Sequence, residues 1–96
     1  MTDKRKAYEE KLAAQLQEWH AQITLLKAKA ETAKAKARVE YYTNLEGLQP
    51  KWDAAQAKLQ ELKGAGDEAW EELKIGAEKS WAEIKTAFHE AVSKLK

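Results

Sequence analysis

The stretch LAAQLQEWHAQITLL, residues 12–26, carries an apolar register that recurs at every third or fourth position. This spacing is typical of one face of an α-helix. The same register continues in both directions, from Tyr8 to Leu62, mostly in alternating steps of four and three. Such steps produce the period of about 3.5 residues that defines a left-handed coiled coil. The stripe is narrow and much of the remaining surface is charged, so a helix that carries it cannot form a core by itself.

The composition of the chain agrees with an all-α fold. Ala, Glu, Lys, Leu and Arg supply 58 of the 96 residues, whereas aromatic residues make up only 8% and β-branched residues are few, which excludes a sheet protein. Seventeen basic residues nearly balance sixteen acidic ones, so no overall charge directs the protein to nucleic acid or anionic membrane. The absence of cysteine excludes disulfides and thiolate metal sites and fits a cytoplasmic location. We expect one domain, residues 1–96, without a cofactor.

A second helix follows the sequence Gly64-Ala65-Gly66, which interrupts the register. Acidic residues open this helix, where they complement its positive end, and its own apolar stripe runs from Trp70 to Leu95. The sequence therefore predicts a long helix over about 3–63, a loop over 64–66 and a second helix over about 67–95, packed as an antiparallel helical hairpin.

One segment leaves the long helix open to two interpretations. Asn44, Gly47 and Pro50 are three helix breakers within seven residues. A break there creates three helices of unequal length. The apolar register stays in phase across the segment, which favours a continuous helix with a proline kink.

The second helix is too short to cover the whole apolar stripe of the first. Folded back at Ala65, it reaches only to about Ala35, and the stripe from Tyr8 to Ala33 then has no partner in its own chain. Burying large apolar side chains stabilises by about 1.5–3 kcal/mol each. We therefore expect a coiled-coil homo-oligomer, a dimer or a tetramer. Its core and oligomer seam consists of Leu12, Leu16, Trp19, Ile23, Leu26, Ala30, Ala33, Ala37, Trp52, Trp70, Trp81 and Phe88.

No motif in the chain points to catalysis, metal binding or nucleic-acid binding. His20 and His89 have no second ligand three or four residues away, and Glu71 and Glu72 point in different directions on a helix. The basic run from Lys27 to Arg38 is split into two rows and holds no aromatic residue for base stacking, so we interpret it as a solvated flank. The sequence thus predicts that the protein is not an enzyme and does not bind nucleic acid.

A different class of function rests on the second helix. Its residues 70–77 and 81–88 form an 11-residue repeat that keeps one apolar face aligned, a spacing that lipid-coating helices can use. Its net charge of −3 over residues 67–95 opposes binding to anionic lipid. The alternative to a scaffold is therefore an amphipathic-helix binder of a membrane or storage-granule surface.

Several segments resemble a family of small bacterial coiled-coil proteins, many of which carry a general stress-response name. They are KLAAQLQEW (11–19), LKAKA (26–30), EYY (40–42), KLQEL (58–62) and AWEELK (69–74). The resemblance implies a bacterial, cytoplasmic, helical protein with a stress-associated role. A looser resemblance, to polyester-granule coat proteins, rests on amphipathic helices without cysteine. We expect a non-catalytic oligomeric interaction or scaffold protein.

Overall fold

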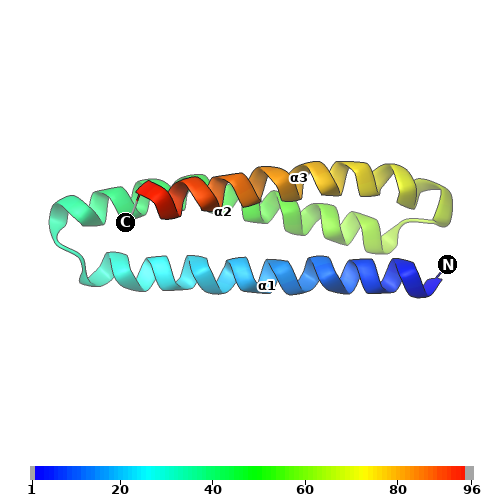
Figure 1. The fold of residues 1–96 in the computed structure, drawn as a ribbon, viewed down its shortest axis with the longest axis horizontal. Coiled ribbons are helices and arrows are strands. Elements are labelled where there is room, and N and C mark those ends of the chain that lie inside the picture. The colour runs from blue at the N-terminus through cyan, green and yellow to red at the C-terminus, as the bar shows by residue number, and fades with distance from the viewer. Residues whose placement is uncertain (1, 95–96) are drawn as a thin grey trace.

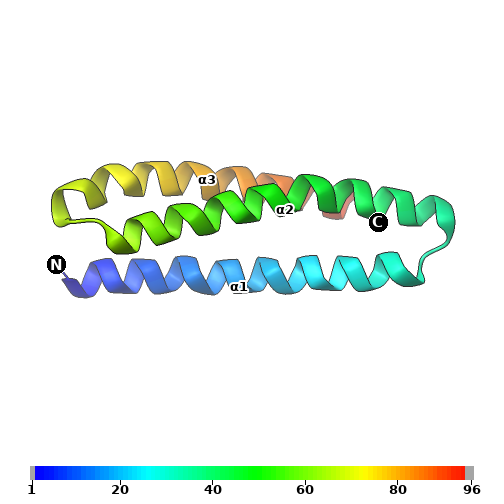
Figure 2. The ribbon, with the colours of Figure 1, turned by 180° about the vertical axis from the view of Figure 1, so that it is seen from behind.

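The computed structural model describes residues 2–94, which form three α-helices and no strand within that range. The helices are α1 (Thr2–Thr32), α2 (Ala35–Gly64) and α3 (Asp67–Lys94). They run antiparallel to one another in succession, so that the α1–α2 turn lies at one end of a rod and the α2–α3 loop lies at the other, next to the start of α1 (Figures 1 and 2). The rod measures 51 × 18 × 17 Å. The all-α class expected from the sequence is confirmed.

The expectation of one long helix over about 3–63 is wrong, because the chain turns back at Ala33 and Lys34. Neither residue is a helix breaker, and both are good helix formers. The turn forms because it lets α2 and α3 cover the apolar stripe of α1, which contributes far more free energy than the few helical hydrogen bonds that the turn interrupts.

The same turn removes the premise on which a partner chain was expected. Leu12, Leu16 and Ile23 are buried against α2 and α3 of their own chain, in one core cluster with residues such as Leu48 and Trp81. The stripe from Tyr8 to Ala33 therefore has its cover within the chain. An oligomer, if it forms, has to use another surface or another arrangement of the same helices.

The segment with three breakers does not interrupt α2. Asn44, Gly47 and Pro50 all lie inside the helix, as the continuous apolar register predicted. Pro50 lacks the N–H that would bond the carbonyl of Glu46, and it lies on the exposed side, where water can satisfy that carbonyl. Asn44 donates its side-chain amide to the carbonyl of Glu40 at 2.8 Å.

The second predicted helix begins where expected, and the loop before it is one residue shorter than the predicted 64–66, because Gly64 is the last residue of α2. α3 begins at Asp67, directly after a loop that contains Ala65 and Gly66, and Asp67 and Glu68 supply the expected negative charge in its first turn. The predicted end at residue 95 lies just outside the described residues.

The three helices do not approach one another equally. α2 packs closely on both neighbours, whereas within residues 2–94 no Cα of α1 lies within 8 Å of a Cα of α3. Aromatic rings fill this wider space. Trp19 stacks on Phe88 at 5.9 Å between ring centroids and lies 6.0 Å from Trp81, and Tyr8 meets Trp70 edge-on at 5.7 Å. The tryptophans of α1 and α3 are thus core residues of the α1–α3 contact.

The core is apolar throughout: none of the buried residues in the described part of the chain is polar or charged. The apolar residues that remain exposed are scattered singly, such as Leu25 on α1 and Ile75 on α3, and scattered residues of this kind are normal for a protein surface. No helix among the described residues is both long enough and apolar enough to cross a membrane.

Candidate functional site

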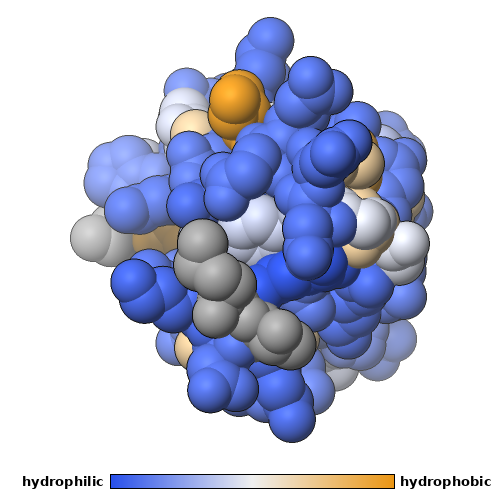
Figure 3. Space-filling view, turned by 90° about the vertical axis from the view of Figure 1, so that its right-hand side faces the viewer, coloured by the Kyte–Doolittle hydropathy of each residue, from blue (hydrophilic) through white to orange (hydrophobic). Residues whose placement is uncertain are grey.

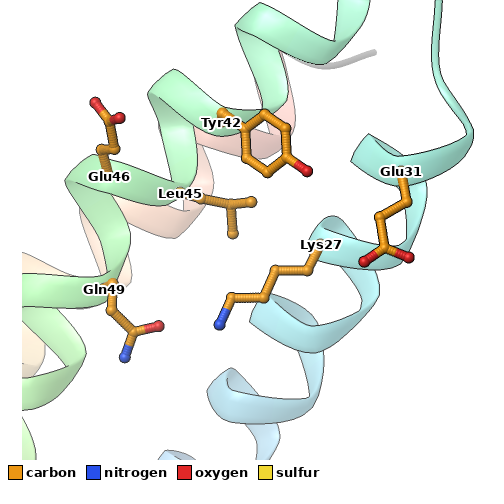
Figure 4. A pocket seen from close by; sticks show the side chains of 6 residues that line it. All are labelled: Lys27, Glu31, Tyr42, Leu45, Glu46 and Gln49. Atoms are coloured by element: carbon orange, nitrogen blue, oxygen red, sulfur yellow. The ribbon is translucent and has the colours of Figure 1, made fainter.

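Two shallow hollows lie one after the other between α1 and α2, each lined by residues of these two helices alone, and together they are called the α1–α2 groove below. Figure 4 shows the part nearest the α1–α2 turn, where Tyr42, Leu45 and Gln49 of α2 lie opposite Lys27 and Glu31 of α1. Leu45 is buried and forms an apolar floor there. The groove exists because only α3 packs on the α1–α2 pair, which leaves the other side of that pair uncovered.

The second part of the groove continues toward the opposite end of the rod and encloses about 400 Å³. Trp52 lines it in a half-buried position, and its indole N–H donates to the carbonyl of Leu16 at 2.8 Å. The ring of His20 lies 5.2 Å from the Trp52 ring. Since Trp52 is held by a hydrogen bond to the backbone of α1, it presents a rigid aromatic surface to the groove. The remaining lining residues of this part are Ala13, Gln17, Ala21, Gln56, Leu59, Gln60 and Lys63.

The part of the groove around Trp52 differs from the other grooves in its lack of charge, whereas the part in Figure 4 holds Lys27, Glu31 and Glu46. Three of the chain's six glutamines line the part around Trp52, a fourth lines the part in Figure 4, and Lys63 is the one charged residue around Trp52. The groove between α1 and α3 is lined by five charged residues, Lys4, Arg5, Asp67, Glu71 and Lys74. The groove between α2 and α3 holds Lys51, Glu90 and Lys94. In a chain with 34% charged residues, the nearly neutral lining is therefore a local feature of the part around Trp52.

Apart from the groove, a cluster of polar side chains joins the three helices at the end of the rod where α1 begins. Arg5 donates to the carbonyls of Leu62 and Ala65 at 3.1 and 2.6 Å, and to the carboxylates of Glu9 and Asp67 at 3.2 and 3.1 Å. Its guanidinium also lies over the Trp70 ring at 5.6 Å. Figure 3 shows this end of the rod, where hydrophilic side chains dominate the surface.

Tyr8 belongs to the same cluster. Its hydroxyl donates to the carboxylate of Glu78 at 3.3 Å, and the Lys74 ammonium lies 5.0 Å from its ring centroid. Burial, followed by the negative charge of Glu78 and the hydrogen bond to it, raises the pKa of Tyr8 to about 12. These effects hold Tyr8 in its neutral form, so it acts as a hydrogen-bond donor between α1 and α3.

The other arginine has a matching role at the α1–α2 turn. Arg38 donates to the carbonyls of Ala30, Glu31 and Ala33 at 3.2, 3.4 and 3.1 Å, which are the last carbonyls of α1 and the turn. Arg5 and Arg38 are the only arginines in the chain, and each holds the polypeptide where one helix ends and the next begins. Sequence reasoning missed both residues. The available signal was that only two of the seventeen basic residues are arginines. The planar guanidinium of arginine carries several N–H donors and binds a set of carbonyls better than the ammonium group of lysine does.

The structure brings the predicted seam residues together inside one chain. Most are buried, and Trp19, Leu26, Ala33, Ala37 and Trp52 are half-buried. The buried members are Leu12, Leu16, Ile23, Ala30, Trp70, Trp81 and Phe88. These residues form the core of the bundle, and of the whole set only Leu16 and Trp52 also line the groove.

The two histidines lie apart, His20 beside Trp52 and His89 exposed on α3. Across residues 2–94 no three side chains of His, Asp or Glu gather in a way that could hold a metal ion. Comparison of the chain with models of known protein families, with curated proteins and with solved structures finds no match.

Proposed function

We propose that the protein is a non-catalytic interaction protein that associates with a second copy of itself through the α1–α2 groove and serves as a cytoplasmic scaffold. The association of two copies through this face is called the groove dimer below. A stress-associated role rests on the resemblance of its segments to bacterial stress-response coiled coils. The observation that carries the proposal is the nearly neutral, glutamine-lined part of the groove, where the Trp52 ring is held by its bond to the Leu16 carbonyl.

The charge distribution along the groove fits a second copy that runs in the opposite direction. The end near Lys63 carries one positive charge, and the end in Figure 4 holds Lys27 with Glu31 and Glu46, for a net charge of −1. An antiparallel two-fold arrangement places each end over the opposite end of the other copy, and the neutral middle over the neutral middle. Such complementarity favours the correct pairing, because like charges across an interface cost several kcal/mol.

The size of the face fits a small dimer interface. The lining residues span positions 13–31 on α1 and 42–63 on α2, roughly 30 Å at about 1.5 Å per helical residue. With the 18 Å width of the rod, each copy contributes roughly 540 Å², near the ~600 Å² per partner at the lower end of specific interfaces.

Glutamate substitutions in the groove test this proposal. Gln17→Glu together with Gln56→Glu places like charges on both copies near the middle of the interface, and we expect at least a tenfold weaker dimer by sedimentation velocity. Gln22→Glu is the matched control, because Gln22 is exposed on α1 and does not line the groove. The proposal fails if the unaltered protein is monomeric at high micromolar concentration, or if the groove and control variants weaken its dimer equally.

A second candidate function is the binding of an uncharged lipid or storage-granule surface by α3. The indole N–H of Trp81 is buried without a hydrogen-bond partner. In addition, α3 contacts α1 only through large side chains, because their backbones lie far apart in the described residues. If α3 swings out on the glycine-containing 64–66 loop, it exposes a continuous apolar face, and the Trp81 N–H can bond polar groups at a membrane interface. Flotation with zwitterionic liposomes, with an increase in exposure of the Trp81 ring to a fluorescence quencher, supports this candidate; a bundle that stays in the soluble fraction refutes it.

A further inference from the structure

The turn between α1 and α2 has a sequence that favours a helix. Ala33 and Lys34 are both good helix formers, and within the described residues no non-glycine residue has a positive φ. Lys34 departs from helical geometry mainly in its ψ of 158°, and no side chain caps the helix at this position. The α2–α3 loop, in contrast, contains Gly66 and directly follows Gly64, the last residue of α2. Rotation about a few backbone bonds of Ala33 and Lys34, chiefly the ψ bond of Lys34, is therefore enough to join α1 and α2 into one helix.

We propose that two copies of the chain exchange α1 by straightening this turn. In the exchanged dimer each chain forms one helix over residues 2–64, and its α1 packs on α2 and α3 of the other copy. The two long helices lie antiparallel and form two three-helix bundles joined end to end. This inference goes beyond the proposed function, because it uses the core of the bundle and does not depend on the groove.

The exchanged dimer preserves the contacts that stabilise the monomer. Every core contact between α1 and the other two helices is remade with the second copy, as in other domain-swapped proteins. The helix also regains backbone hydrogen bonds from residues 34, 35 and 37 to the carbonyls of Ala30, Glu31 and Ala33. Where the two long helices cross, the small residues Ala30, Ala33 and Ala37 allow them to lie close together.

Arg38 holds the monomer in the closed form. Its guanidinium donates to the carbonyls of Ala30, Glu31 and Ala33, which are three of the four carbonyls, those of residues 30–33, that accept hydrogen bonds across this point in a continuous helix. Straightening the turn displaces Arg38 from all three. A side chain at position 38 that binds these carbonyls more weakly than arginine therefore shifts the equilibrium toward the exchanged dimer.

Electrostatic repulsion acts in the same direction as Arg38. The segment from Lys27 to Arg38 carries five positive charges and one negative charge, and it lies at the end of the rod where the two bundles meet in the exchanged dimer. Repulsion between the two ends opposes exchange, and salt screens it over a Debye length of about 8–10 Å at physiological ionic strength. The exchanged dimer is therefore favoured as the salt concentration rises.

The test compares variants of the full chain that have been concentrated, warmed until α1 detaches, and cooled. Size exclusion with light scattering counts the copies, and small-angle X-ray scattering measures the longest dimension. We expect a species of two copies about twice as long as the 51 Å rod, in an amount that increases with salt. Arg38→Lys keeps the charge but loses the planar fork, and we expect it to raise the dimerisation constant about tenfold. Lys36→Arg, at an exposed position two residues away, is the matched control and leaves the constant unchanged.

A second variant, expected to act in the opposite direction from Arg38→Lys, lowers the helix propensity of the turn. Ala33→Gly together with Lys34→Gly lowers the dimerisation constant by about two to three orders of magnitude, because both chains must place two glycines inside a helix. Circular dichroism checks that this variant remains helical. The inference is overturned if Arg38→Lys forms no more dimer than the unaltered chain, or if the double-glycine variant forms as much. We expect the groove variant Gln17→Glu with Gln56→Glu to form the exchanged dimer as the unaltered chain does. The groove dimer and the exchanged dimer are therefore tested by different variants, and either proposal can fail without the other.

Discussion

Two tryptophans of α3 differ in one hydrogen bond, and this difference predicts unequal losses of stability. Trp70 and Trp81 are both 7% exposed, but only the Trp70 N–H has a partner, the carboxylate of Glu9 at 2.9 Å. Replacement by phenylalanine removes similar volume at both sites. Trp70→Phe also removes this bond from the Glu9 carboxylate, which then keeps only its donor from Arg5, so we expect it to cost about 1–2 kcal/mol more than Trp81→Phe in denaturant unfolding. Equal losses at the two sites would contradict the assignment of these bonds.

Tyr8 predicts how stability depends on alkaline pH. Its pKa is raised from 10.0 in the unfolded chain to about 12 in the bundle, by burial first and by Glu78 second. Because the unfolded phenol ionises first, the stabilisation is complete below pH 10 and is lost as the pH rises through 12. The free energy of unfolding should therefore fall in this range relative to that of Tyr8→Phe. Glu78→Gln should lower the pKa of Tyr8, measured as tyrosinate absorbance after subtraction of the Tyr8→Phe titration; an unchanged pKa would show that Glu78 does not contribute.

At the scale of the helices, Arg5 joins the C-terminal end of α2 to α1 and to the start of α3. Its donors reach two backbone carbonyls and two carboxylates, and its side chain is only 20% exposed. A lysine keeps the charge but cannot reach these four acceptors at once, so we expect Arg5→Lys to cost about 2 kcal/mol, or roughly 10 °C in Tm. Lys6→Arg, at the neighbouring exposed position, is the control and should leave Tm unchanged. Equal Tm values for both variants would show that the charge alone suffices.

The elements that could be predicted from the sequence are those with a local signal. The apolar stripes of α1, α2 and α3 and the glycines at 64 and 66 led to the right helix faces and to the second turn. The turn at Ala33 and Lys34 has no local signal, because it is stabilised by the packing of α1 on distant residues and by Arg38. The groove could not be predicted for the same reason: Gln17 and Gln56 share a face only once this turn places α1 beside α2.

At the scale of the whole molecule, the position of residue 6 relative to residue 64 reports where α1 lies. In the bundle the two positions are at the same end of a 51 Å rod, where Arg5 donates to the carbonyl of Leu62, whereas in a continuous helix they are separated by about 90 Å at roughly 1.5 Å per residue. The chain has no native cysteine, Lys6 is exposed, and a Cβ at Gly64 meets no atom within 4 Å, so Lys6→Cys with Gly64→Cys allows clean spin labelling.

The doubly labelled chain is diluted into excess unlabelled chain, and the distance between its two labels is measured by double electron–electron resonance. In fresh monomer this distance should be short. After warming and cooling at high concentration, the dimer fraction should show the distance near 90 Å, because each labelled chain then spans two bundles. The groove dimer leaves the short distance intact, since its chains remain closed. A long distance in the fresh monomer would contradict the three-helix bundle itself, because α1 packed beside its own α2 keeps residues 6 and 64 at one end of the rod.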